Sequence, residues 1–145
     1  MTRRGDDTPA HFEYAAGAQT GYSLASRIST EMVRFMSRYT GRGPTRARTT
    51  LNTNVAAVVL EDTLTKAETN LVAAGEIEAV CQQRRTFHHL MRDEVIATIE
   101  ELTGRRVRAY LSDISPEAGI AAHTFVFEPR PDTGEAYVAE RSDDG

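Results

Sequence analysis

Apolar residues recur at spacings of three and four between about Thr20 and Tyr39. They are Leu24, Ile28, Met32, Phe35 and Tyr39. This period places them on one face of an α-helix. Gly41 follows as a residue that can end a helix in the left-handed conformation, and Pro44 prevents the helix from resuming. The pattern predicts an amphipathic helix over about 20–39.

The segment from Thr45 to Glu61 is rich in threonine and valine, and Asn52-Thr53-Asn54 interrupts it with residues typical of a tight turn. The residues before the turn alternate between two sides, with Ala47, Thr49 and Leu51 on one and Arg46, Arg48 and Thr50 on the other. After the turn almost every residue is apolar, which is typical of a central strand covered on at least one face. We therefore expect a β-hairpin.

A second helical region begins with a capping box, Thr65 followed by Glu68. We expect a pause at Gly75 and then one long helix that ends at Gly104. Its apolar stripe consists of Ile77, Val80, Cys81, Arg84, Phe87, His88, Met91, Val95, Ile99 and Leu102. A stripe of this length predicts a helix that lies across the sheet and could also contact a partner helix.

The last periodic region predicts a second hairpin. Val107, Ala109 and Leu111 alternate with Arg108, Tyr110 and Ser112. Ser115 to Gly119 supplies a turn, and the strand after it carries Phe125 and Phe127 on one face. The predicted fold class is α+β: a four-stranded antiparallel sheet of two hairpins with two long helices packed on one face, in the order α-β-β-α-α-β-β.

The two helix-hairpin units lie about 63 residues apart and have similar junctions. Tyr39-Thr40-Gly41-Arg42 precedes the first hairpin, and Leu102-Thr103-Gly104-Arg105 precedes the second. Duplication would explain this likeness, but glycine terminators before strands are also common.

The chain of 145 residues is long enough for one domain. We expect a domain over 19–128 between a flexible N-terminal segment, 1–18, and an acidic flexible tail, 129–145. The sequence contains neither a run of apolar residues long enough to span a membrane nor a secretory signal, so we expect a cytoplasmic protein without a membrane span. Cys81 is the single cysteine, and we expect it to fill the core.

Arginines crowd the region around the glycine-containing loop Gly41–Pro44. A loop with two glycines can expose backbone N–H groups, so the loop and its neighbours could hold a small anion such as bicarbonate or a phosphorylated metabolite. The candidate residues are Arg38, Arg42, Gly43, Arg46 and Arg48. The simpler interpretation is a helix stop followed by a strand start. The six arginines from Arg27 to Arg48 also suggest nucleic-acid binding, which the net charge of −4 disfavours.

The long helix carries four candidate interface or structural residues: Arg84, Phe87, His88 and Met91. Because buried arginines need partners, we expect Arg84 to meet a carboxylate such as Glu61 or Asp113. His88 and His89 are adjacent and point in different directions, so they do not predict a metal site. The sequence contains no nucleophile motif of a known type, so we expect no catalytic residues and no cofactor.

Several segments resemble the MpsC family over roughly residues 20–128. They are Gly41-Arg42-Gly43-Pro44, Leu64 to Leu71 with Gly75, and Ile99 to Arg105 before Leu111-Ser112-Asp113. The family's name implies association with a sodium-translocating, membrane-potential-generating system, whose neighbouring components resemble inorganic-carbon uptake machinery. The resemblance implies an accessory or regulatory role and offers no established catalytic residues.

The leading hypothesis is therefore a non-enzymatic accessory or regulatory module that self-associates, most simply as a homodimer, and acts with a membrane-system partner. A small-anion sensor that binds at the Gly41–Pro44 loop is the alternative. Nucleic-acid binding through the Arg27–Arg48 region is a weaker one.

Overall fold

The computed structural model describes residues 23–130. Its elements follow the predicted order: α1 (Leu24–Thr40), β1 (Arg46–Leu51), β2 (Val55–Glu61), α2 (Lys66–Ala73), α3 (Ile77–Thr103), β3 (Val107–Ser115) and β4 (Ile120–Phe127). The predicted α+β class is confirmed. The predicted N-terminal segment lies outside the described residues, as does the predicted acidic tail apart from Pro129 and Arg130.

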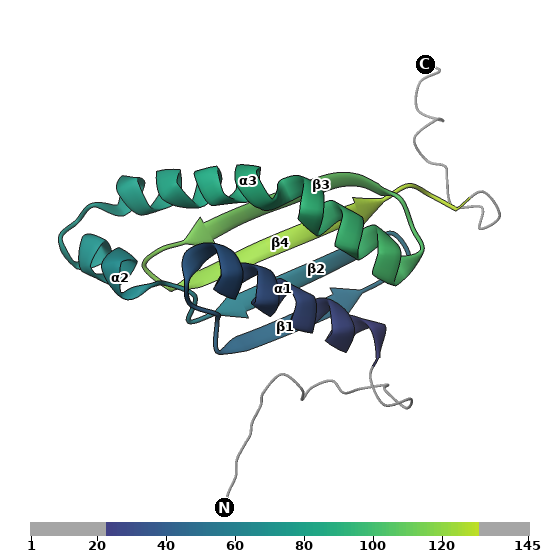
Figure 1. Ribbon diagram of the computed structural model, residues 1–145, viewed down its shortest axis with the longest axis horizontal. Coiled ribbons are helices and arrows are strands. Elements are labelled where there is room, and N and C mark those ends of the chain that lie inside the picture. Colours follow the sequence, from purple (N-terminus) through teal and green to yellow (C-terminus); the bar gives the residue numbers. More distant parts are fainter. Residues whose placement is uncertain (1–22, 131–145) are drawn as a thin grey trace, which may run out of the picture.

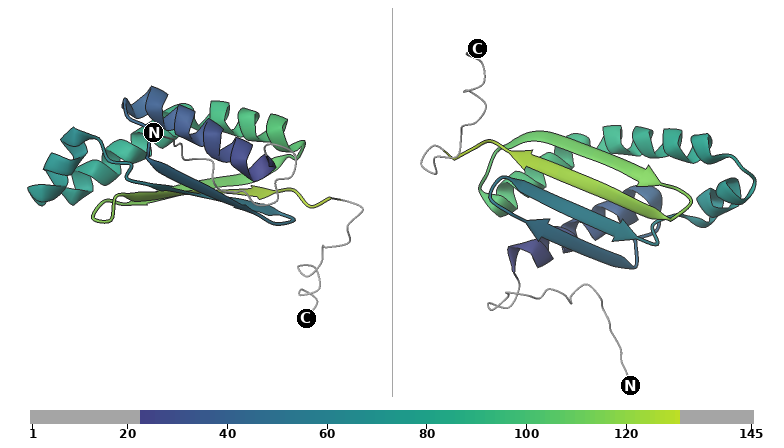
Figure 2. Two further views of the ribbon diagram at one scale, coloured as in Figure 1. Left: turned by 90° about the horizontal axis from the view of Figure 1, so that it is seen from below. Right: turned by 180° about the vertical axis from the view of Figure 1, so that it is seen from behind.

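The four strands form one antiparallel sheet in the order β1-β2-β4-β3. The second strand of each hairpin therefore lies at the centre, and the first lies at an edge. The helices cover one face of this sheet (Figure 1). Seen from behind, the other face carries no helix of the described chain (Figure 2). The predicted packing of two long helices on one face is confirmed, and it produces a two-layer molecule.

Caps in the sequence set the bounds of the helices. Helix α1 begins at Leu24 because the Ser23 side chain accepts a hydrogen bond of 3.0 Å from the backbone N–H of Ser26. It ends at Gly41, whose φ of 87° is left-handed, and α3 ends in the same way at Gly104 with φ 69°. Both predicted glycine terminators are confirmed.

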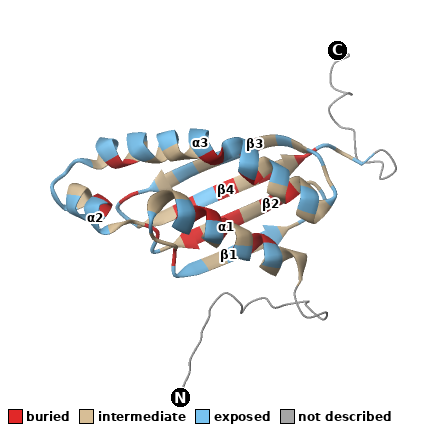
Figure 3. Ribbon diagram, viewed as in Figure 1, coloured by how far each residue is buried: buried red, intermediate tan, exposed pale blue. Residues whose placement is uncertain are grey.

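The core lies between the two layers (Figure 3). Helix α1 contributes Ile28, Met32, Phe35 and Met36, and α3 contributes Met91, Val95 and Ile99. The sheet contributes Ala56, Val58, Leu60, Tyr110, Ala121, Phe125 and Phe127. On β2 every second residue is buried, so its other residues belong to the open face.

One expectation for the second hairpin is wrong. The alternation predicted Val107, Ala109 and Leu111 on one face of β3, but a bulge between Val107 and Ala109 shifts the register. Beyond the bulge Tyr110 is buried and Leu111 is 59% exposed. A shift of one residue exchanges the two faces of a strand, so Leu111 lies on the open face.

Candidate functional site

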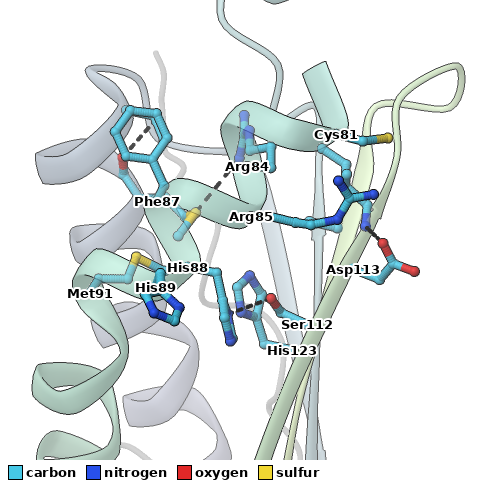
Figure 4. A pocket seen from close by; sticks show the side chains of 14 residues that line it. Cys81, Arg84, Arg85, Phe87, His88, His89, Met91, Ser112, Asp113 and His123 are labelled. Atoms are coloured by element: carbon cyan, nitrogen blue, oxygen red, sulfur yellow. Dashed lines mark hydrogen bonds between the residues drawn. The ribbon is translucent and has the colours of Figure 1, made fainter. Parts of the chain in front are cut away.

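A cavity of about 260 Å³ lies between α3 and the strands β3 and β4 (Figure 4). Met36, Phe87, Met91 and Ala121 supply much of its apolar lining. Its polar lining includes Arg84, His88, Ser112 and His123. A mostly apolar cavity with a few polar groups is the usual form of a small-molecule site.

Arg84 forms the best-connected ion pair in the described chain. Its Nε and one terminal nitrogen donate to the two carboxylate oxygens of Glu68 at 2.8 and 2.7 Å. The same terminal nitrogen donates to the Thr63 carbonyl at 2.5 Å. The side chain of Arg84 is 9% exposed and that of Glu68 is 0% exposed. The pair joins α3 to the start of α2 and to the preceding loop.

The sequence predicted Glu61 or Asp113 as the partner of Arg84, and this prediction is wrong, because the partner is Glu68. Glu68 belongs to the capping box of α2, which the sequence predicted correctly, and its side chain also accepts from the backbone N–H of Thr65 at 2.9 Å. Gly75, with φ 81°, turns the chain so that α3 runs back beside α2. This turn brings Glu68 of the capping box into contact with the buried Arg84.

Burial alone would raise the pKa of Glu68. The hydrogen bonds from Arg84 and Thr65, together with the Arg84 charge, outweigh burial and hold the pKa of Glu68 below its ordinary value of 4.5. Glu68 and Arg84 are therefore both charged at neutral pH, and their charges compensate each other.

Two histidines are linked to β3. His88 Nδ1 and Ser112 Oγ lie 2.6 Å apart, and His123 Nδ1 and the Tyr110 hydroxyl lie 2.8 Å apart. The Tyr110 ring stacks on Phe125 with ring centres 4.6 Å apart and lies 4.5 Å from the His88 ring. These contacts tie α3 to the central strand through one aromatic cluster.

Burial keeps this cluster uncharged. It lowers the pKa of His123 from 6.5 to about 3, with smaller effects from His88 and Arg84. Burial also lowers the pKa of His88, again with smaller effects from the charges of Arg92 and His89. It raises the pKa of Tyr110 above its ordinary value of 10. Both histidines are neutral at physiological pH.

The contact between Ser112 and His88 pairs a hydroxyl with an imidazole, as in nucleophilic catalysis. Within residues 23–130, however, no carboxylate is hydrogen-bonded to His88, and Ser112 lies in the middle of a strand rather than at a sharp turn. Over the same range, no group of three or more His, Cys, Asp or Glu side chains is arranged to hold a metal ion. Within the described residues the Ser112–His88 contact thus lacks the third, orienting group of a catalytic triad.

The arginines of the predicted anion site are paired with carboxylates of this chain. Arg42 donates to Asp62 Oδ2 at 2.9 Å, to the Leu64 carbonyl at 3.2 Å and to the Asp62 carbonyl. Arg38 donates to Glu94 at 2.9 Å. The hydrogen bond from Arg42 lowers the pKa of Asp62, whose backbone φ of 58° is left-handed. Arg42 thus fastens the loop after α1 to the loop after β2.

Arg46 and Arg48 lie on β1, away from the loop that Arg42 fastens. Thr49, between Arg48 and Thr50, is hydrogen-bonded to Ser29 of α1 at 2.8 Å, so Arg46 and Arg48 point to the open face of the sheet. They lie 3.7 and 3.9 Å from Glu61. The structure therefore does not bring the five candidate residues together around one loop.

Gly43 has a packing role. A Cβ atom at this position would lie 2.6 Å from Ser37 Oγ and 3.4 Å from a methyl group of Val33. The glycine allows the loop to approach α1 closely.

The remaining candidates lie along α3. Met91 is 1% exposed and belongs to the core, whereas Phe87 and His88 are half-buried. Cys81, which we expected to fill the core, is also half-buried and lines the cavity. Only Met91 among these residues is closed off from solvent.

Sequence reasoning missed Glu68, Ser112 and His123 as parts of this site. The signal for His123 was present, because counting back by two from Phe127 and Phe125 along β4 places His123 on the same buried face. Ser112 could not be placed before the bulge in β3 was known.

No helix in the described part of the chain is both long and apolar enough to cross a bilayer. A family model described as "Na+-translocating membrane potential-generating system (MpsC)" matches residues 20–129. The chain belongs to the MpsC family. Comparison of this MpsC-family chain with curated proteins and with solved structures gave no match.

Proposed function

We propose that this MpsC-family chain is a non-enzymatic accessory or regulatory module that self-associates in the cytoplasm and acts with a membrane ion-translocating or inorganic-carbon uptake system. The observation that carries the proposal is the match of residues 20–129 to a family named for Na+ translocation. Because no helix of the described part can cross a bilayer, this part would work beside membrane-embedded components.

The internal pairing of the polar groups supports a non-enzymatic role. Arg84 is paired with Glu68, Ser112 with His88, and Tyr110 with His123. Each of these contacts links one element of the fold to another, so each has a structural role that requires no reaction.

The direct test is the Na+-dependent membrane potential of cells from which the protein has been removed. We expect the potential, followed with a voltage-sensitive dye, to fall and to recover when the wild-type chain is supplied again. An unchanged potential and unchanged bicarbonate uptake would contradict the proposal.

A second candidate function is small-molecule sensing, which the cavity of about 260 Å³ favours. The charge of Arg84 is compensated by Glu68, so the lining suits a largely apolar molecule with one or two hydrogen-bonding groups. Bicarbonate or a phosphorylated metabolite at the Gly41–Pro44 loop receives less support, because Arg38 and Arg42 are paired with Glu94 and Asp62.

Thermal-shift screening separates the two ligand sites. A cavity ligand should raise the melting temperature of the wild type and of Ala97→Leu, an exposed position on α3, but not of Ala121→Leu, which fills the cavity. Ser112→Leu is a second filling variant if Ala121→Leu does not fold. A shift caused by bicarbonate or phosphate and lost in Arg42→Ala would instead support the loop.

Nucleic-acid binding receives the least support. The arginines from Arg27 to Arg48 are divided among α1, the loop after it and the open face of the sheet, and most are paired with carboxylates. A phosphate-binding surface needs unpaired cations that face the same way.

A further inference from the structure

No described element covers the open face of the sheet (Figure 2), and much of that face is apolar. The uncharged residues that β2, β4 and β3 place near its centre are Val55, Ala57, Val59, Ala122, Thr124, Val126, Ala109 and Leu111, while Glu61, Ile120, Asp113 and Ser115 belong to the same face toward one end of the strands. Leu111 is 59% exposed, and Ala122 is also exposed. Contiguous apolar patches of this kind mark interaction sites in soluble proteins.

Opposite charges flank this apolar patch. Arg48 lies on the edge strand β1, and Asp113 lies on the other edge strand, β3. The pairing register places both in one row across the sheet, Arg48–Val59–Ala122–Asp113. Figure 4 shows Asp113 and Ser112 on opposite sides of β3.

We infer that the open face is the interface with a second copy of this chain, related by a twofold axis parallel to the strands. Rotation about such an axis lays β1 of one copy over β3 of the other. Because the axis runs along the strands, each row of paired residues then lies opposite the same row of the second copy. Arg48 of each copy then faces Asp113 of the other, while the valine-rich centre packs on itself. A closed, self-complementary interface of this kind is the commonest form of homodimer.

The two charged groups are available for such pairing. Arg48 lies 3.9 Å from Glu61 in a loose contact, with its side chain 64% exposed. Asp113 accepts a hydrogen bond from the backbone N–H of Ile114 and forms no ion pair within residues 23–130. An interface would bring each charge close to an opposite one.

The size of the face suits a dimer. Four strands of about seven residues cover roughly 20 Å by 25 Å, given strand spacings of about 4.8 Å and a rise of about 3.3 Å per residue. Two such faces would bury on the order of 1,000 Å², which is about the lower limit for a specific interface. Aligned stacking of two sheets would also produce a normal β-sandwich.

Other surfaces of the described chain are less suitable. The edge strand β1 presents Arg46 and Arg48, and the edge strand β3 is interrupted by its bulge. Charges and bulges at sheet edges oppose edge-to-edge pairing. Leu90 of α3 is exposed, but three charged residues, Arg92, Asp93 and Glu94, lie close to it along the helix. The surface around Leu90 is therefore not a contiguous apolar patch.

This inference rests on the self-association in the proposed function and assigns it a surface. Its first test is the molar mass of the full chain by light scattering at tens of micromolar. We expect a dimer for the wild type and for Leu90→Glu, in which a leucine 64% exposed on α3 is changed. We expect a monomer for Val126→Glu, because Val126 on the central strand β4 would face Val55 of the second copy and the carboxylate would be buried between valines. A monomeric wild type would overturn the inference, as would a dimer formed by folded Val126→Glu.

Charge reversal tests the twofold geometry. Arg48→Asp and Asp113→Arg each place like charges across the interface, so we expect each to raise the dimer dissociation constant about tenfold. The double variant restores opposite charges and should return the constant to within about threefold of wild type, because the two changes compensate each other. Additive weakening in the double variant would overturn the geometry.

The outcomes distinguish this inference from the proposed function. If the wild type is monomeric but membrane potential still depends on the chain, the accessory role stands and the interface is wrong. If the dimer forms as inferred but potential and bicarbonate uptake do not depend on the chain, the accessory role is wrong.

Discussion

The two helix-hairpin halves of the domain share a layout and differ in their polar groups. In both halves a helix ends at a left-handed glycine, an edge strand follows, and a central strand completes the hairpin. In the first half the arginines pair with carboxylates at the surface, whereas the second half has, besides the surface pairs of Arg85 and Arg92, polar pairs buried beside a cavity. The shared layout does not locate the site, but the buried polar groups do. Duplication of the unit stays a hypothesis.

The largest effect should come from the buried pair of the second half. Arg84→Ala leaves the Glu68 carboxylate without its partner, so we expect the free energy of unfolding to fall by about 3–5 kcal/mol. Urea denaturation followed by circular dichroism measures the change. A loss below about 1 kcal/mol would mean that the pair is no more than a surface contact.

The buried histidine should make stability depend on pH. Because the pKa of His123 falls from 6.5 to about 3 on folding, its contribution is fully present above pH 6.5 and is lost as pH falls toward 3. The slope for one such group approaches about 1.4 kcal/mol per pH unit. Between pH 6.5 and 5 the depressed pKa of His88 adds to this slope, whereas Glu68 contributes only at lower pH.

His123→Gln should flatten this dependence, because an amide side chain does not titrate in this pH range. Melting temperatures between pH 6.5 and 5 would show the change. The control is Ala97→Gln, an exposed position on α3 without a titratable group, which should leave the slope unchanged. Equal slopes for wild type and His123→Gln would refute the assignment of the pH dependence to this residue.

Arg42 in the first half should have a smaller effect. Arg42→Ala removes its hydrogen bonds to Asp62 and Leu64, so we expect a loss of about 1 kcal/mol, independent of added bicarbonate or phosphate. Chemical denaturation with and without the anions measures both. Stabilisation of the wild type by either anion, absent in Arg42→Ala, would restore the anion-site hypothesis.

The smallest effect should be that of Arg38→Ala. Arg38 and Glu94 are 56% and 50% exposed, and such surface pairs contribute about 0.5 kcal/mol or less. The same denaturation series provides the value. An effect as large as that of Arg84→Ala would remove the contrast between the two halves.

The fold could be predicted because each of its main features has a local signal. The spacing of apolar residues predicted the helices and strands. Gly41 and Gly104 predicted the ends of two helices, and Thr65 with Glu68 predicted the capping box of α2. The site depends on contacts between distant segments. The partner of Arg84 is set by the reversal at Gly75, and the face of Leu111 is set by a bulge that the sequence pattern does not reveal.

Our central proposal is that the polar groups of the second half link elements of the fold rather than catalyse a reaction. The most direct measurement is the Na+-dependent membrane potential of cells in which Ser112→Ala replaces the wild-type chain. The account predicts a potential equal to wild type, because only the hydrogen bond between Ser112 and His88 is lost. A potential as low as that of cells without the protein, with the variant folded and present at normal levels, would contradict it.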